Sequence, residues 1–172
     1  APESMSKRLK NCISGRIPKV DAVRDLLSRI NPDEIRSIHE EMIDIIKRNR
    51  VFREGTIGGY VVAGLDGVEL FSSTKKSCPN CLSRKKHTGE TEYFYRSVVC
   101  MIIGKSPHVI LGQEMLKPRD GSGKDEGELT GGKRLIERLK KRHGHFADVI
   151  VADALYLNAP FINTLKENGL EG

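Results

Sequence analysis

The stretch that decides the fold is Tyr60-Val-Val-Ala-Gly-Leu65-Asp66-Gly67, with its counterpart Asp148-Val-Ile-Val-Ala152-Asp153 far along the chain. In each stretch a hydrophobic run of strand length ends directly before an aspartate. An unpaired aspartate is costly inside a buried strand, whereas the carboxyl ends of strands open at the mouth of an α/β sheet, where such sheets place their sites. Two such aspartates on neighbouring strands predict a site for a divalent cation.

Both aspartates also have ordinary structural interpretations. Asp66-Gly67 is a common turn dipeptide, and Asp153 is a suitable N-cap for the segment that follows it. Spacing alone does not distinguish these interpretations from a metal site. The order of the surrounding strands and helices is needed to choose between them.

Composition sets wide limits on the chain. Its 172 residues suffice for one domain with a core, and the formal net charge of +6 with a pI near 9.2 favours a polyanionic partner. No apolar run approaches the ~18 residues of a membrane span, and the first residues lack the apolar part of a signal peptide. We therefore expect a cytoplasmic protein whose cysteines are thiols or metal ligands rather than disulfides. The four cysteines are Cys12, Cys78, Cys81 and Cys100.

The pattern of apolar residues predicts a mixed α/β chain in two parts. Residues 1–55 form an N-terminal helical region, in which Asn31-Pro32 separates two amphipathic helices. Residues 56–172 form the core, with a polar, basic loop over about 72–91. Its expected elements are antiparallel strands at 60–65, 68–71, 92–103 and 107–111, a helix at 128–142, a strand at 148–152 and a helix at 158–167.

The order of these elements brings the two aspartates together. A strand that returns after a long helix is expected to lie parallel to the first strand of the sheet. The strand at 148–152 would then pair with the strand at 60–65, and Asp66 would lie beside Asp153. The element order therefore favours the metal-site interpretation over the turn and the cap.

Several motifs resemble those of insertion-sequence DDE transposases, in order and spacing, from about residue 16 to 169. Asp66-Gly-x-x-Leu-Phe-Ser-Ser73 resembles the first catalytic motif of that family, and Ala152-Asp153-Ala-Leu-Tyr156 resembles the second. The intervening tracts also resemble the family: Cys78-Pro-Asn-Cys81-Leu-Ser-Arg84, Glu92-Tyr-Phe-Tyr95, Gly112-Gln-Glu114-Met, and Lys124-Asp-Glu-Gly-Glu128 followed by Lys133-Arg134. So do the lead-in helices at Ile17-Pro18-Lys-Val-Asp21 and Ile30-Asn31-Pro32.

The resemblance implies a ribonuclease-H-like mixed sheet, with antiparallel strands plus one parallel strand, behind an N-terminal helical lead-in. It implies metal-dependent DNA cleavage and strand transfer with Mg²⁺ or Mn²⁺, and Asp66 and Asp153 as the first two catalytic carboxylates. DNA at transposon ends would be the partner, with a second copy or a full-length transposase, in a prokaryotic cytoplasm near the nucleoid. The family's third carboxylate would lie beyond residue 170, so we expect a C-terminally truncated core.

Two further carboxylates are candidates for the same site. Glu128 opens the basic helix, where a ribonuclease-H-like fold can place a carboxylate beside the strand aspartates. A first-turn glutamate also complements a helix dipole without any such role. Glu114 is the second candidate, and a salt bridge at the end of its strand is the alternative for it.

The basic loop holds the remaining candidates. Cys78 and Cys81 have the spacing of a zinc knuckle, but zinc binds four ligands and only His87 and Cys100 lie nearby in sequence. A reduced pair of thiols is the alternative. The basic side chains flanking the site offer phosphate contacts, against the alternative of a solvated surface. These candidates are Lys75, Lys76, Arg84, Lys85, Lys86, Lys133 and Arg134.

Three functions therefore stand side by side. The first is a fragment of a DDE transposase that cleaves and joins DNA. The second is an inactive transposase remnant that binds DNA or the complete enzyme. The third is a structure-specific nuclease of the same fold, which needs a full set of carboxylates within residues 1–172 and so depends on Glu114 or Glu128.

Overall fold

A computed structural model describes residues 18–53, 56–104, 106, 108–119 and 124–172. The chain divides into two compact units, Ala1–His39 and Glu40–Gly172. Cys12 and the first residues of the expected lead-in lie outside the described residues. Among the described residues, no helix has both the length and the apolar character that crossing a membrane requires.

The expected helix pair is present in the described part of the N-terminal region. It consists of α2, Val20–Arg29, and α3, Pro32–Arg48. Between them Asn31 Oδ1 accepts a hydrogen bond from the Asp33 backbone N–H at 3.0 Å, and Pro32 is the first residue of α3, as predicted. The second unit begins within α3, which contributes the buried Ile43 to the core.

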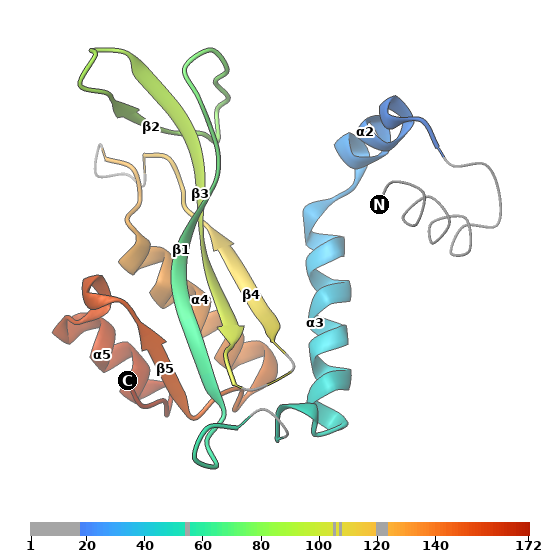
Figure 1. Cartoon of the computed structure of the whole chain (residues 1–172), viewed down its shortest axis with the longest axis vertical. Coiled ribbons are helices and arrows are strands. Elements are labelled where there is room, and N and C mark those ends of the chain that lie inside the picture. The colour runs from blue at the N-terminus through green and yellow to red at the C-terminus, as the bar shows by residue number, and fades with distance from the viewer. Residues whose placement is uncertain (1–17, 54–55, 105, 107, 120–123) are drawn as a thin grey trace. The chain divides into compact units, whose positions relative to one another are not determined.

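The second unit is a mixed α/β structure built on one five-stranded sheet. The strand order is β2-β3-β1-β5, with β4 also paired to β3 (Figure 1). Every pair is antiparallel except β1 with β5. The strands are β1, Val62–Ser73; β2, Leu82–Lys85; β3, Thr91–Ile102; β4, Val109–Met115; and β5, Val149–Ala152. This confirms the α/β class and the mixed sheet.

Two expectations about the strands were wrong. The strands expected at 60–65 and 68–71 form the single strand β1, because β3 pairs with β1 from Ala63 to Ser73 and holds it extended through Asp66-Gly67. A bulge between Glu69 and Phe71 is the irregularity in this ladder. The turn interpretation of Asp66-Gly67 is therefore also wrong.

The basic segment over 72–91 was expected to be a loop, but it contains β2. This strand pairs antiparallel with the first residues of β3, from Leu82 opposite Phe94 to Lys85 opposite Thr91. A tight turn follows, in which the Lys86 N–H donates to Glu90 O at 2.9 Å. Leu82 is buried, so one apolar residue anchors a segment whose composition alone indicated a loop.

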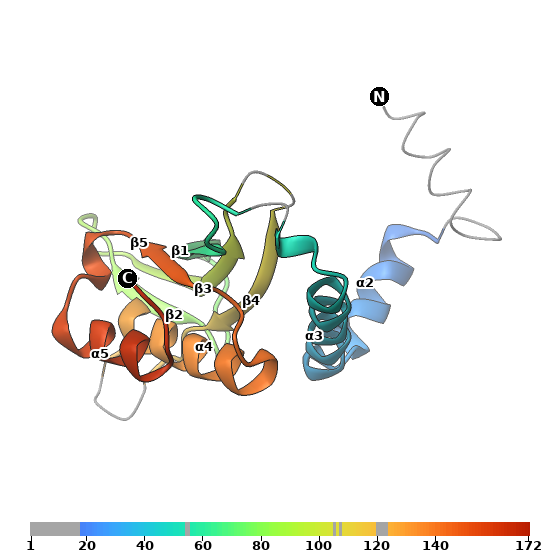
Figure 2. The ribbon, with the colours of Figure 1, turned by 90° about the horizontal axis from the view of Figure 1, so that it is seen from below.

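Two helices cover one face of the sheet. They are α4, Glu128–His143, and α5, Ala159–Glu167, and Figure 2 shows both on the same side of the strands. The Asn158 side chain caps α5 by accepting from the Phe161 N–H at 3.0 Å, and Gly169 follows the helix at φ +68°. The core lies between the helices and the sheet, and includes Leu65, Val98, Leu135, Ile136 and Phe161.

The parallel pairing that the element order predicted is confirmed. β5 lies beside β1 in parallel, with Val62 opposite Val149 and Leu65 opposite Ala152. Asp148 fastens the start of this pair, since its Oδ2 accepts from the Val61 N–H at 2.7 Å and its own N–H donates to Val61 O at 2.8 Å. On its other edge β5 forms a parallel bridge with Glu171.

Candidate functional site

Asp66 and Asp153 directly follow the last residue pair of the parallel ladder, Leu65 and Ala152. β5 ends at Ala152, so Asp153 lies at a strand end as expected. Asp66 does not, because β1 continues along β3, and this corrects the prediction for Asp66. Its side chain is nevertheless exposed, since β5 has ended and the edge of β1 beside Asp66 has lost its neighbour.

Both aspartates line the same groove, of about 540 Å³, on the sheet face away from α4. Side chains alternate along β1, so Leu65 enters the core while Gly64, Asp66 and Val68 face the groove. The groove is otherwise apolar, and Val68 and Val151 remain 39% and 49% exposed. The structure therefore brings together the two residues that the sequence singled out.

Each aspartate makes one local hydrogen bond and keeps an oxygen available. Asp66 Oδ1 accepts from the Gly67 N–H at 2.8 Å, and Asp153 Oδ1 accepts from the Leu155 N–H at 3.0 Å. Among the described residues these are the hydrogen bonds of the two carboxylates. The second bond makes Asp153 the N-cap of a short 3₁₀ helix, Ala154–Tyr156, so its capping role is real and is compatible with a role in a site.

The two carboxylates fit the donor set of a hard divalent cation. Mg²⁺ is bound in proteins through one or two carboxylates together with waters and substrate phosphates. Asp66 and Asp153 are both exposed and line one groove, and each has one carboxylate oxygen outside its local hydrogen bond. The described residues contain no cluster of three or more His, Cys, Asp and Glu side chains placed to hold a metal.

Glu128 lies against β1 but not in the groove. Its carboxylate occupies the space where a side chain at position 67 would be, and Arg96 Nη1 donates to Glu128 Oε1 at 2.8 Å. Because neighbouring side chains on a strand point to opposite faces, Glu128 meets the face of β1 opposite to Asp66. It is also the first residue of α4, where its charge complements the helix dipole.

Tyr156 is buried, and the charges of these carboxylates act on its hydroxyl. It is 2% exposed and its hydroxyl has no hydrogen-bond partner among the described residues. Burial raises the pKa of Tyr156 most, and the negative charges of Glu128, Asp153 and Asp66 raise it further. The Tyr156 hydroxyl is thus held neutral, within electrostatic reach of all three acids.

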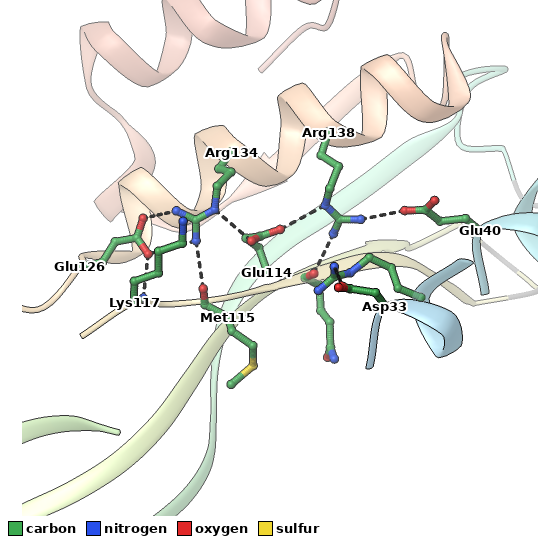
Figure 3. A network of polar contacts seen from close by, with 10 residues as sticks. Asp33, Glu40, Glu114, Met115, Lys117, Glu126, Arg134 and Arg138 are labelled. Atoms are coloured by element: carbon green, nitrogen blue, oxygen red, sulfur yellow. Dashed lines mark hydrogen bonds and ion pairs between the residues drawn. The ribbon is translucent and has the colours of Figure 1, made fainter. Parts of the chain in front are cut away.

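Glu114 belongs to an ion-pair network that ties α4 to β4 (Figure 3). Arg134 Nε donates to Glu114 Oε1 at 2.9 Å, and Arg138 Nε donates to Glu114 Oε2 at 3.1 Å. Arg134 also pairs with the buried Glu126, and Arg138 pairs with Glu40 at 3.0 Å. The structure thus shows for Glu114 the salt bridge that sequence offered as the alternative to a site role.

The basic side chains proposed as phosphate contacts differ in whether they already pair with carboxylates. Arg84 pairs with Glu69 at 2.9 Å and with Glu92 at 2.7 Å, while Lys86 pairs with Glu92 at 2.9 Å. Arg134 is held in the network described above. A phosphate would have to compete with these carboxylates. Lys86 is exposed in spite of its ion pair, Lys75, Lys76 and Lys85 are also exposed, and Lys133 is half-buried.

Cys78 and Cys81 lie together before β2. Their Sγ atoms are 2.8 Å apart, and Cys78 Sγ is 2.6 Å from the hydroxyl of Tyr95 on β3. The candidate further zinc ligands do not join them in a cluster among the described residues, since Cys100 is fully buried near the end of β3 and His87 lies in the turn after β2.

Sequence reasoning missed two residues of this region. Arg96 pairs with Glu128 at 2.8 Å and lies 3.6 Å from Glu69, and the buried Tyr156 has its pKa raised in part by nearby acids. Arg96 lies on β3, thirty residues after Asp66, and only the strand register reveals that it faces this part of β1. Tyr156 had a signal, because it is the third residue after Asp153 on a short helical turn.

Comparison with known proteins gives no match. No protein-family model matches the chain, and neither does any curated protein or solved structure at a significant level.

Proposed function

We propose that this chain is the core of a DDE-type transposase with a ribonuclease-H-like fold. In a complete enzyme such a core would carry out metal-dependent cleavage and joining of DNA strands. The observation that carries the proposal is the parallel register of Leu65 with Ala152, which sets Asp66 and Asp153 at adjacent positions on neighbouring strands. The groove that both aspartates line and the resemblance of their motifs to the transposase family support the same proposal.

In this proposal Asp66 and Asp153 hold Mg²⁺ or Mn²⁺ through the oxygens that their local hydrogen bonds leave available. A cation bound there would supply Lewis-acid activation of water or a DNA 3′-hydroxyl and stabilise the leaving oxygen. Backbone N–H groups of the chain fix the orientation of the two carboxylates. The Gly67 N–H orients the Asp66 carboxylate, and the Leu155 N–H orients the Asp153 carboxylate.

DNA would approach along basic side chains at the end of the β1–β3 ladder. Lys75 and Lys76 follow β1 directly, and Lys85 ends β2. All three lysines are exposed, and such side chains contact phosphates without reading bases. Binding in this mode holds a strand of any sequence at this end of the sheet.

A second function is favoured by the placement of the other carboxylates. Glu128 is held by Arg96 on the opposite face of β1, and Glu114 is held by Arg134 and Arg138. Among the described residues, the groove therefore has Asp66 and Asp153 as its acids. This arrangement suits a remnant that binds a metal, DNA or a complete transposase without cutting DNA.

Metal titration tests the site itself. We expect Mn²⁺, followed by electron paramagnetic resonance, to bind the wild-type chain, and Asp66→Asn and Asp153→Asn each to weaken binding at least tenfold. Glu137→Gln removes an exposed carboxylate from α4 and is the matched control. Equal Mn²⁺ binding by all four proteins would refute the site.

A nicking assay separates the two functions. If the chain cuts a supercoiled plasmid with Mn²⁺ and Asp66→Asn abolishes cutting, the groove is a working active site. If Mn²⁺ binding depends on both aspartates but no cutting occurs, the chain is a binding remnant. We expect the second result for this chain, because two-metal chemistry needs further ligands to fix the second ion.

A further inference from the structure

A tight turn brings two cysteines together at Cys78-Pro-Asn-Cys81. The Cys81 N–H donates to Cys78 O at 3.1 Å, which is the hydrogen bond of a β-turn. Pro79 stands at the second position of this turn, where its fixed φ is favoured. A β-turn keeps its first and last Cα atoms within about 7 Å, and this is also the limit within which two cysteines can be bridged.

The side chains of Cys78 and Cys81 also lie close together. The two Sγ atoms are 2.8 Å apart, and a disulfide bond measures about 2.05 Å, so closure requires a movement of less than about 1 Å. Cys81 is 8% exposed, whereas Cys78 is more open to solvent. One sulfur is therefore accessible to a reagent, and the second stands directly behind it.

The surroundings give the two thiols different acidities. Hydrogen bonds to Cys78 Sγ, from the Cys81 thiol first and the Tyr95 hydroxyl second, lower the pKa of Cys78. The same pairing with Cys78, followed by burial, raises the pKa of Cys81. Cys78 thus carries the thiolate character that makes a cysteine nucleophilic. Cys100 differs from both, because complete burial raises its pKa to about 12.

We propose that Cys78 and Cys81 are a reactive dithiol that small disulfides oxidise reversibly to an intramolecular disulfide. The Cys78 thiolate attacks one sulfur of the reagent R–S–S–R, forming a mixed disulfide and releasing one RS⁻. Cys81 then loses its proton to solvent and attacks Cys78 Sγ, forming the Cys78–Cys81 bond and releasing the second RS⁻. The two cysteines lose two electrons, and the reagent is reduced to two thiols.

The sulfur geometry favours this chemistry over a zinc site. Two thiolates 2.3 Å from a tetrahedral zinc ion stand about 3.8 Å apart. The observed 2.8 Å is well inside that separation. Tyr95 completes the cluster at 2.6 Å from Cys78, and a phenol that donates to a thiolate fits a nucleophilic cysteine.

Oxidation by hydroxyethyl disulfide tests the proposal. The full chain is used with Cys12→Ser, a residue outside the described part, so that Cys12 does not contribute. We expect intact-mass and peptide analysis to show loss of two hydrogens with Cys78 and Cys81 linked. Cys81→Ser should stop at a stable adduct on Cys78, and Cys78→Ser should react at least tenfold more slowly. Circular dichroism establishes that each variant is folded.

Tyr95→Phe tests whether Tyr95 affects the reactivity of Cys78, because a purely structural role of Tyr95 would not change the pH dependence of Cys78 alkylation. The rate of Cys78 alkylation by iodoacetamide should rise with pH along a curve displaced to higher pH in Tyr95→Phe, because a donor to the thiolate is lost. Dithiothreitol should restore both thiols. Separate adducts on the two cysteines, no reaction at Cys78, or stoichiometric zinc that protects both thiols would each overturn the proposal.

Discussion

Leu65 on β1 and Ala152 on β5 are the last paired residues of the parallel ladder, and each is followed by an aspartate on the open edge of the sheet. The ladder is only four residue pairs long, from Val62 to Leu65. Its register therefore decides whether Asp66 and Asp153 lie together, and contacts that fix the register act on the site from a distance.

Asp148 is the contact that fixes this register, and its removal should loosen the β1–β5 pair. Asp148→Ala loses the hydrogen bond from the Val61 N–H, so we expect the free energy of unfolding to fall by about 1–2 kcal/mol. Asp148→Asn keeps an acceptor oxygen and should lose less. Urea denaturation at pH 7 measures both, with Glu137→Gln as control, and equal losses in the two Asp148 variants would contradict the argument.

The same contact makes stability depend on pH. The Val61 N–H, and secondarily His145, lower the pKa of Asp148 from its ordinary 3.8, although burial opposes them. The folded-state pKa is thus below the unfolded one, so the stabilisation is present above about pH 4 and is lost as pH falls through the folded-state pKa. Asp148→Asn should show a smaller loss of stability between pH 5 and pH 3 than the wild type.

Gly67 has no room for a side chain. A Cβ there would collide with the carboxylate of Glu128, so Gly67→Ala must displace Glu128 from Arg96. We expect Gly67→Ala to lower the free energy of unfolding by about 1–3 kcal/mol. Adding Glu128→Ala should recover part of that loss, and a double-mutant cycle measures the coupling. Additive effects would show that Gly67 is constrained by something else.

The elements that could be predicted are those whose position follows from the local pattern of apolar residues along the sequence. Helices with a clear apolar face, such as α5, which ends at Glu167, were placed within a residue or two, and the parallel strand followed from element order. β1 was divided in two because Asp66-Gly67 is a turn dipeptide, and its pairing with β3 overrides that local preference. β2 was missed because a single buried residue, Leu82, anchors it.

The candidate site was predictable only where the chemistry lay in the sequence motifs. Asp66 and Asp153 end or follow apolar runs, so their residue type and position were informative. The side of β1 that Glu128 meets depends on the register of α4 against the sheet, which no local pattern encodes. Arg134 was read as a phosphate ligand from its basic helix, although three-dimensional packing places Glu114 and Glu126 around it.

Arg134 should matter for stability. Arg134→Ala leaves Glu126, whose side chain is 2% exposed, with the Lys117 N–H as its remaining donor, and takes one of two arginines from Glu114. Removing one member of a fully buried pair costs about 3–5 kcal/mol, and because the Arg134 side chain is 29% exposed the loss should lie at the lower end of this range. We expect a loss of that order in urea denaturation, with a smaller loss for Arg134→Lys, which keeps the charge without the planar fork. Lys133→Ala is the neighbouring control and should change stability little.

DNA binding should be weak, tolerant of sequence and steeply dependent on salt, with the exposed lysines after β1 and β2 as its main contacts. Replacing Lys75, Lys76 and Lys85 together by Ala should reduce the slope of log K against log salt by about 2–3, since each phosphate contact contributes about 0.9. Fluorescence anisotropy with a duplex oligonucleotide at several salt concentrations measures the slope. A triple Ala variant of the exposed Lys19, Lys117 and Lys166 has the same net charge and is the control. Equal slopes for the two triple variants would mean that net charge, rather than this group of lysines, governs binding. A salt-independent affinity in the wild type would contradict phosphate contact altogether.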